Sequence, residues 1–364
     1  MKIESIDIIN FRNYDKIHIE FKSNLNIIYG LNGAGKTNLV EAIYLLSLTK
    51  SFRLNNDKLL IRKGMEKATV EGEIQKNKDT SNYKVVLNPD GKKVLINNTK
   101  IDKISEYVSK INIVLFHPTD TNLVTEAPSE RRKLLNIEIS SINKEYLIVL
   151  SNYNRILKQR NFYLRQLYLN GNKTTDYLDI LTKKLIEYGS LINKYRANFC
   201  ENINKYISKY YEDIFGEGKI LIKYISTYNN KDEEQLLEMY KKYYSKELAI
   251  GKTIIGVHHD DIVFKLDGNN LKEWGSTGQR KNAIISFKLA ELNVIRDSKG
   301  YYPILILDDL FSELDKTKIN NIFKMLNEEV QTFITTTEIE NISEDLLKTS
   351  NKIKIEKGTI KEEV

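Results

Sequence analysis

Residues 30–37 place glycines, a lysine and a threonine at the spacing G-x-x-x-x-G-K-[ST], which is typical of a phosphate-binding loop. Glycines let the backbone turn tightly, so that successive N–H groups point at phosphate oxygens. Lys36 adds a positive charge at the β- and γ-phosphates, and the Thr37 hydroxyl is placed to ligate Mg²⁺. The sequence therefore predicts an ATP site. Its expected contacts in this loop are Gly30, Leu31, Asn32, Gly33, Ala34, Gly35, Lys36, Thr37 and Asn38.

The segments on either side of the loop support this interpretation. Residues 25–29 have the composition of a strand, and residues 38–48 contain neither Gly nor Pro and favour a helix. A strand that delivers a glycine-rich loop to a helix N-terminus is an anion-binding arrangement.

A second acidic motif follows the aliphatic stretch 301–307, which is typical of a buried parallel strand. Asp308 and Asp309 stand directly after it, where a Walker B carboxylate belongs. We expect Asp308 to hold Mg²⁺, partly through water, and Asp309 to orient or deprotonate the attacking water. The predicted catalytic residues are Lys36, Asp308 and Asp309.

Residues 276–279, Ser-Thr-Gly-Gln, fit the signature motif of the ABC-type ATPases and precede a predicted helix. A serine hydroxyl, a glycine N–H and a helix N-terminus can donate to a γ-phosphate held by another subunit. Ser276, Gly278 and Gln279 are therefore expected contacts, and the motif predicts an ATP-dependent homodimer. Residues 312–315 resemble the D-loop that lies along such an interface.

Two further positions are less typical. Thr337 stands where ABC proteins usually carry a switch histidine, so we expect a neutral hydrogen bond to phosphate and slow hydrolysis. His117 occupies the place of a Q-loop, but its position is equally consistent with an ordinary loop histidine. His258 and His259 lack further ligands at metal spacing, so a polar loop near the nucleotide or DNA is the preferred interpretation.

Outside these motifs, the spacing of apolar residues distinguishes strand-like segments from helical ones. Alternating strands are expected around 5–21 and 68–96, whereas residues 129–169 and 181–210 carry apolar side chains at helical spacing. The two helical runs predict an antiparallel hairpin inserted into an α/β ATPase. We therefore expect an N-terminal ATPase lobe at 1–127, an inserted helical lobe at 128–250 and a C-terminal ATPase lobe at 251–364.

Composition indicates a soluble globular protein: of 364 residues, 41% are hydrophobic and 29% charged, and Cys200 is the single cysteine. No stretch is long enough for a membrane span, and a cytoplasmic location is the natural expectation. The net charge of +7 suits a nucleic-acid partner. Candidate DNA contacts, each equally consistent with a solvated surface, are Lys50, Arg53, Arg62, Lys63, Arg131 and Arg132.

Taken together, these motifs resemble the RecF family of bacterial recombination-repair ATPases, which are related to the SMC head domains. The resemblance runs nearly end to end. It includes residues 10–14 (NFRNY), 32–46, 51–53, 128–135, 256–261 and the motifs around Ser276 and Asp308. It implies an α/β head of the P-loop ABC/SMC-like type, with a mixed sheet, N-terminal antiparallel strands and a helical insertion.

The same resemblance implies a function. Members dimerise around ATP and Mg²⁺ on double-stranded DNA and at junctions of double- and single-stranded DNA, and they act with RecO and RecR to load RecA at gaps. Arg12 would lie near the adenine or the α-phosphate. Two alternatives are an ABC transporter ATPase subunit, against which the long separation of Lys36 and Ser276 argues, and a small-molecule kinase, which needs no signature motif.

Overall fold

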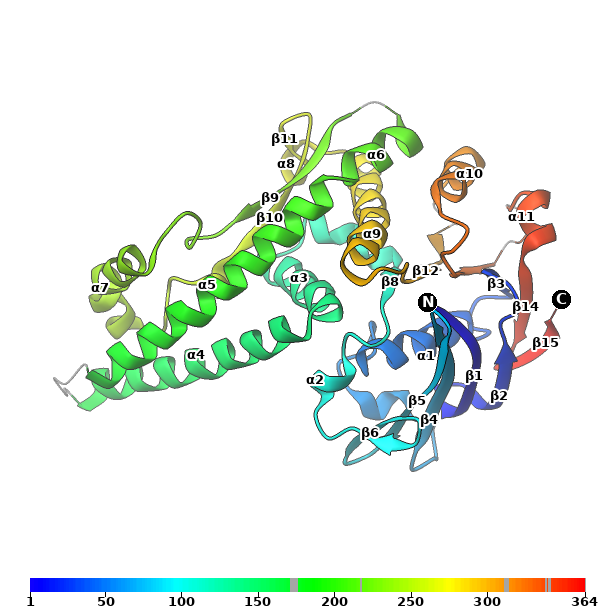
Figure 1. Cartoon of the computed structure of the whole chain (residues 1–364), viewed down its shortest axis with the longest axis horizontal. Coiled ribbons are helices and arrows are strands. Elements are labelled where there is room, and N and C mark those ends of the chain that lie inside the picture. The colour runs from blue at the N-terminus through cyan, green and yellow to red at the C-terminus, as the bar shows by residue number, and fades with distance from the viewer. Residues whose placement is uncertain (171–175, 217, 311–313, 338, 340–341, 364) are drawn as a thin grey trace. The chain divides into compact units, whose positions relative to one another are not determined.

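The computed structural model of the chain describes residues 1–170, 176–216, 218–310, 314–337, 339 and 342–363 (Figure 1). The chain forms two compact units. The first comprises residues 1–121, 206–219 and 281–364, and the second comprises residues 122–205 and 220–280.

One sheet of the first unit carries the strands that lead to the predicted ATP site. Its order is β15-β14-β3-β13-β12-β8, in which β15 alone runs antiparallel to its neighbour. The strands are β3 (Leu25–Tyr29), β8 (Ile113–Phe116), β12 (Ile304–Asp308), β13 (Thr332–Thr336), β14 (Asn351–Glu356) and β15 (Thr359–Glu363). All five residues of β12 are buried, as the aliphatic sequence predicted.

The second sheet of this unit is antiparallel, in the order β2-β1-β4-β5-β6-β7. It consists of β1 (Lys2–Phe11), β2 (Tyr14–Glu20), β4 (Ala68–Lys76), β5 (Asp79–Asn88), β6 (Gly91–Ile96) and β7 (Thr99–Lys100). The alternation of apolar and polar residues predicted strands around 5–21 and 68–96, and the structure confirms them there; β7 lies outside the predicted segments.

Helix α1 (Lys36–Leu48) lies between the two sheets and contacts strands of both. Leu39, Val40, Ile43 and Leu46 are fully buried and join the same hydrophobic core as residues of β1, β4, β12 and β13. The helix that follows the phosphate loop is therefore fixed from two sides by apolar burial. The short helices of this unit are η1 (Asp57–Leu60), α2 (Ile104–Tyr107), α6 (Ile207–Phe215), α10 (Lys316–Met325) and α11 (Glu344–Thr349).

The second unit is built on α4 (Lys144–Asn170) and α5 (Asp176–Asn204), which lie side by side in Figure 1. This pair confirms the predicted helical hairpin. The predicted run 129–169 is in fact two helices, α3 (Pro128–Ile142) and α4, because Asn143 is extended (φ −132°, ψ 110°) and its side chain accepts a hydrogen bond from the Glu145 N–H. The remaining helices are α7 (Glu233–Ile250), η3 (Val257–His259) and α8 (Leu271–Trp274).

Residues 251–280 belong to this helical unit because β10 (Asp261–Leu266) pairs with β9 (Ile220–Ile225) and with β11 (Asn269–Asn270). The helices η2 (Pro118–Val124) and α9 (Thr277–Lys299) each span a boundary between the two units along the chain. The boundaries of the predicted lobes, 1–127, 128–250 and 251–364, stay a prediction. No helix in the described part of the chain is both long enough and apolar enough to cross a bilayer.

Candidate nucleotide site

The phosphate loop connects β3 to α1 through backbone conformations that only glycine adopts easily. Gly30 has φ 147° and Gly35 has φ 124°. A Cβ on Gly30 would collide with the Ile355 carbonyl oxygen, and one on Gly35 would lie 2.7 Å from Nδ2 of Asn13. The loop is therefore packed closely against β14 and against the turn between β1 and β2.

Hydrogen bonds from distant segments hold the carbonyl groups of the loop. Asn13 Nδ2 donates to the Ala34 carbonyl (3.1 Å), which also accepts from the Gly358 N–H (2.9 Å). The Tyr14 hydroxyl donates to the Gly35 carbonyl (2.9 Å). These contacts fix the loop with its carbonyls satisfied by the protein. The predictions above did not include Asn13, Tyr14 or Gly358, although Asn13 and Tyr14 stand in the segment 10–14 that carries the family resemblance.

The Lys36 side chain forms hydrogen bonds with carbonyl groups at the start of its own loop. Its Nζ donates to the carbonyls of Gly30 (2.8 Å) and Leu31 (3.0 Å). Burial lowers the pKa of Lys36, an effect that the carboxylates of Asp309 and Asp308 oppose. The ammonium thus stands inside the loop, next to the acidic end of β12.

The structure brings Thr37 and Asp308 together, as predicted for a cation site. Since β3, β13 and β12 are parallel neighbours, their carboxyl ends meet at one edge of the sheet. Asp308 Oδ1 accepts from Thr37 Oγ1 (3.2 Å) and from Thr335 Oγ1 (2.6 Å). Thr335 Oγ1 also accepts from the Asp309 N–H (2.9 Å). Hydroxyl and carboxylate oxygens at a glycine-lined loop are the donors that Mg²⁺ prefers, so these residues fit the cation and nucleotide that the motif implies.

Thr335 is not among the predicted site residues; Thr337, in the same run of threonines at the end of this strand, is the predicted one. Thr337 follows β13 and is exposed. The sheet order explains the role of Thr335: β13 lies between β3 and β12, so the side chain at its end lies between the two motifs.

His117 also lies beside Asp308. It follows β8, its Nε2 lies 3.6 Å from Oδ2 of Asp308, and its side chain is 19% exposed. The ring packs against Phe52, with the ring centres 5.3 Å apart. His117 therefore lies beside the acidic residue of the predicted site.

Arg12 forms a two-pronged ion pair with Glu41 of α1. Nε lies 2.7 Å from Oε2 and Nη2 lies 3.1 Å from Oε1, while Nη1 donates to the Leu59 carbonyl (3.4 Å). Glu41 is fully buried and also accepts from the Ser51 hydroxyl (2.5 Å). Arg12 thus joins α1 to the segment that follows it. Its contact with a nucleotide stays a prediction.

The signature motif forms the N-terminus of α9, in the second unit. The Ser276 hydroxyl accepts from the Gln279 N–H (3.1 Å), and Oε1 of Gln279 accepts from the Ser276 N–H (2.9 Å). This reciprocal pair is a capping box. Ser276, Gly278 and Gln279 are all exposed, as is Trp274, at 78%.

Part of the predicted D-loop, Ser312 and Glu313, lies outside the described residues. Asp315, at its end, caps α10: its Oδ1 accepts from the Lys318 N–H (2.9 Å).

The candidate DNA contacts differ in their surroundings. Lys50, Arg53 and Lys63 are exposed on the segment that follows α1. Arg62 forms an ion pair with Asp15 (2.7 Å).

Arg131 is not a solvated surface residue. It is buried, and its guanidinium donates to both carboxylate oxygens of Asp261 (2.7 and 2.9 Å) and to three backbone carbonyls. Because these donors are used within the second unit, Arg131 stabilises that unit, and its contact with DNA stays a prediction. The neighbouring Arg132 is half-buried and donates to the Asp260 carbonyl (2.8 Å).

The two adjacent histidines differ from each other in their surroundings. His258 Nδ1 hydrogen-bonds the Tyr153 hydroxyl (2.7 Å), and Nε2 lies 3.2 Å from the Thr253 carbonyl. Burial lowers the pKa of His258 to about 4, so the ring is neutral at pH 7. His258 is therefore a packing residue of the second unit, whereas His259 is exposed. Among the described residues, no three His, Cys, Asp or Glu side chains are grouped to hold a metal ion.

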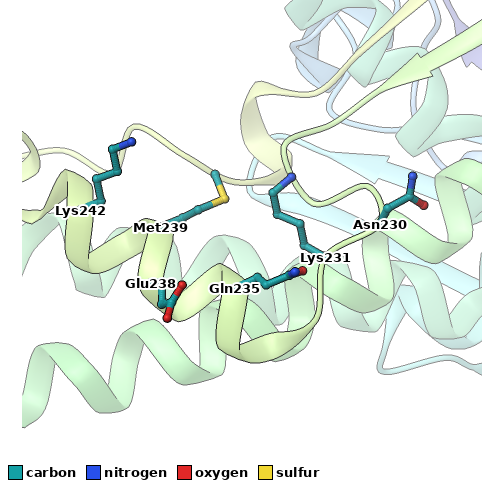
Figure 2. Close-up of a pocket in the computed structure, with 6 residues that line it drawn as sticks. All are labelled: Asn230, Lys231, Gln235, Glu238, Met239 and Lys242. Atoms are coloured by element: carbon teal, nitrogen blue, oxygen red, sulfur yellow. The ribbon is translucent and has the colours of Figure 1, made fainter.

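A surface pocket lies elsewhere, on α7 and the turn before it in the second unit (Figure 2). Its lining residues are Asn230, Lys231, Gln235, Glu238, Met239 and Lys242. None of them was predicted to bind nucleotide or DNA. The candidate site is accordingly defined by the geometry of the phosphate loop and β12.

Comparisons with known proteins agree with this geometry. Residues 2–361 match the family described as RecF/RecN/SMC N terminal domain. The DNA replication and repair protein RecF of Listeria welshimeri is 37% identical over 368 aligned positions, which cover 99% of this chain and 100% of that protein. A solved structure of the recombination mediator protein RecF-ATP in the RecFOR pathway has a TM-score of 0.90 and 32% identity, and the match covers 100% of this chain and 97% of that one. An Smc head domain from Pyrococcus furiosus shares the fold, with 16% identity, a TM-score of 0.56 and coverage of 100% and 96%.

Proposed function

The chain belongs to the RecF family, and from this membership we propose that it is an ATP-dependent DNA-binding protein of recombinational repair and replication. The observation that carries the proposal is the meeting of the phosphate loop with Asp308 at one edge of the sheet, through the Thr37–Asp308 contact of 3.2 Å. Family membership leaves the transporter and kinase alternatives without support.

In this proposal the residues of the loop bind ATP. Backbone N–H groups of residues 30–38 and the Lys36 ammonium hold the phosphates, while Thr37 and Asp308 hold Mg²⁺, partly through water. The bound nucleotide supplies a phosphoanhydride bond for hydrolysis. Asp309 orients the attacking water, and Thr337 donates a hydrogen bond to phosphate. Hydrolysis is slow because a threonine at this position carries no charge.

A second copy of the chain completes the site. Ser276, Gly278 and Gln279 are exposed at the N-terminus of α9, which favours an anion. We therefore propose an ATP-dependent homodimer, in which each copy presents these residues to the γ-phosphate held by the other.

The dimer acts on double-stranded DNA and on junctions with single-stranded DNA. Exposed Lys50, Arg53 and Lys63 supply charge that neutralises phosphates without reading bases. By analogy with the family, the protein works with RecO and RecR to help RecA load at gaps.

Two variants separate nucleotide binding from dimerisation. Lys36→Met removes the charge inside the loop and should abolish ATP binding. Ser276→Arg should leave ATP binding intact and block the dimer. Sedimentation with ATP and Mg²⁺ is expected to give a dimer for the wild type and a monomer for both variants, and calorimetry should detect nucleotide binding only by the wild type and Ser276→Arg. A wild-type chain that stays monomeric at saturating ATP, with unchanged DNA affinity, would refute the proposal.

A charge-removal pair tests the DNA surface. The double variant Lys50→Ala/Lys63→Ala should reduce the slope of log affinity against log salt by about two, because each lysine contributes about one released counterion. The matched control is Lys241→Ala/Lys242→Ala, which removes two exposed lysines from α7 in the second unit. Equal salt slopes for the two double variants would rule out this surface.

A further inference from the structure

We propose that Trp274 of one copy packs against Leu31 of a second copy, so that each nucleotide site of the dimer receives an apolar contact from the partner chain. The inference rests on the proposed function, because the contact forms only in the ATP-dependent homodimer. It adds a direct contact between the two proteins to the contacts that each of them makes with the shared nucleotide.

Leu31 and Trp274 are the most exposed large hydrophobic side chains in the described part of the chain, at 82% and 78%. Single exposed apolar residues are common on protein surfaces. These two differ in their positions, because each stands beside one of the two motifs that the proposed dimer brings together. Leu31 follows Gly30 in the phosphate loop, and Trp274 precedes Gly275 and Ser276. A contact between copies removes both side chains from water.

The reach of each motif brings these side chains to the same place when the dimer forms. The Leu31 carbonyl accepts from the Lys36 ammonium (3.0 Å), which is the group expected at the β- and γ-phosphates. Ser276 of the second copy is proposed to contact the same γ-phosphate. Trp274 stands two residues before Ser276, so their Cα atoms are at most about 7 Å apart. The indole therefore lies within side-chain reach of Leu31 on the other copy.

The backbone that carries Trp274 is held by hydrogen bonds within the second unit. Arg280 of α9 donates from Nε to the Leu271 carbonyl (3.0 Å) and from Nη2 to the Lys272 carbonyl (3.1 Å), both in α8. A Cβ on Gly275 would lie 2.6 Å from the Leu271 carbonyl oxygen, so the chain turns closely from α8 into α9. An exposed tryptophan on a fixed backbone loses little conformational freedom on association, which favours it as an interface anchor.

The backbone at Leu31 is fixed as well. Its carbonyl accepts from the Ala34 N–H (3.1 Å) in addition to the Lys36 ammonium. Residue 31 is a variable position of the phosphate-loop motif, in which backbone N–H groups rather than this side chain face the phosphates. The leucine side chain is therefore available for a contact with protein.

The symmetry of the dimer doubles the effect of the contact. In a two-fold dimer each copy presents both side chains, so the Leu31–Trp274 pair occurs twice. Truncation of one interface anchor weakens association by about tenfold or more. Loss of the pair from both sites should therefore weaken the dimer about a hundredfold.

The dissociation constant of the dimer tests the contact in a double-mutant cycle. Sedimentation equilibrium compares the full chain with Leu31→Ala, Trp274→Ala and the double variant, each with Mg²⁺ and a non-hydrolysable ATP analogue. Each single variant should dimerise about a hundredfold more weakly, and the double variant little more weakly than either. The matched controls are Leu169→Ala and Phe162→Ala, which truncate side chains on α4 that are 73% and 62% exposed and should leave the dissociation constant unchanged.

Cross-linking between two different chains identifies the contact without relying on a loss of affinity. Leu31→Cys and Trp274→Cys chains are mixed with the analogue and treated with a short bismaleimide, and we expect a heterodimer joined through these two positions. Cys200, the single native cysteine, is buried and should not react. Replacing the Leu31→Cys chain by a Leu169→Cys chain should abolish the product.

Three results would overturn the inference and leave the proposed function standing. They are additive or absent losses in the cycle, a loss with Trp274→Ala alone, which would place the indole against nucleotide or DNA, and a dimer in sedimentation that gives no cross-link. A wild-type chain that stays monomeric at saturating ATP would instead overturn the proposed function and this inference with it.

Discussion

Replacing Arg12 by alanine asks whether this side chain stabilises α1 or acts on the nucleotide. In the structure the guanidinium forms two short contacts with Glu41, and the Glu41 carboxylate is fully buried. The Arg12→Ala variant would leave that carboxylate with the Ser51 hydroxyl as its remaining partner among the contacts described above. We therefore expect a loss of stability even when no nucleotide is present.

The expected loss in unfolding free energy follows from the burial of the Arg12–Glu41 ion pair. Removing one partner of a buried ion pair costs about 3–5 kcal/mol, and we take the lower end, about 3 kcal/mol, because the Arg12 side chain is 18% exposed. Glu41→Gln keeps the shape of the side chain and removes its charge. It should lower the free energy of unfolding by about 2 kcal/mol. Since either change breaks the same interaction, the double variant should cost little more than Arg12→Ala. The coupling free energy should then be about 2 kcal/mol.

The double-mutant cycle requires two measurements on each variant, the free energy of unfolding and the hydrogen exchange of α1. Urea unfolding followed by circular dichroism gives the unfolding free energies, and hydrogen exchange of peptides from 36–48 shows whether the loss is concentrated in α1. Peptides from α5 (Asp176–Asn204) in the second unit serve as an internal control, and their exchange rates should not change.

Additive costs for the two changes, with coupling below about 0.5 kcal/mol, would refute the ion-pair reasoning. ATP titrations then address the other role of Arg12. If Arg12→Ala weakens ATP binding while Glu41→Gln leaves it unchanged, Arg12 acts on the nucleotide directly, as the family resemblance implies.

Three further predictions concern single side chains. Thr335→Val removes a donor to Asp308 and should weaken binding of ATP with Mg²⁺ about tenfold in calorimetry, an effect that Thr335→Ser should restore. Gly35→Ala places a methyl group 2.7 Å from Asn13 Nδ2 at a φ of 124°, so binding of a fluorescent nucleotide should be lost; unchanged affinity would show that the turn yields. The pKa of His258 is about 4 in the folded chain and about 6.5 when unfolded, so between these values the unfolded chain binds more protons and stability falls as the pH falls. The loss should reach about 2 kcal/mol at pH 5, measured by urea unfolding followed by circular dichroism, and should disappear in His258→Asn.

Local chemistry made much of the site predictable. The phosphate loop needs its glycines, lysine and threonine close together in the chain, so the motif can be found in the sequence. The buried strand before Asp308 could be found because its side chains are continuously aliphatic. Both features depend on neighbouring residues, and the structure confirms that Thr37 and Asp308 lie together.

The parts that could not be predicted depend on tertiary neighbours. Asn13 and Gly358 bond the same loop carbonyl although they are separated by most of the chain. Arg131 has the sequence surroundings of a surface residue, but its partner Asp261 is 130 residues away. The hydrophobic pattern of residues 129–169 is continuous across Asn143, so the break between α3 and α4 depends on one extended residue and its side-chain cap.

The bond from Gly358 to the phosphate loop has a consequence for the synthesis of the protein. Residues 30–37 leave the ribosome well before β13 (Thr332–Thr336) and β14 (Asn351–Glu356), the neighbours of β3, and before Gly358 itself. At about 5–20 residues per second, the loop waits on the order of tens of seconds for these partners. A nascent chain therefore contains the complete motif before the partners of the loop have been synthesised, and we expect nucleotide binding only after synthesis has passed Gly358.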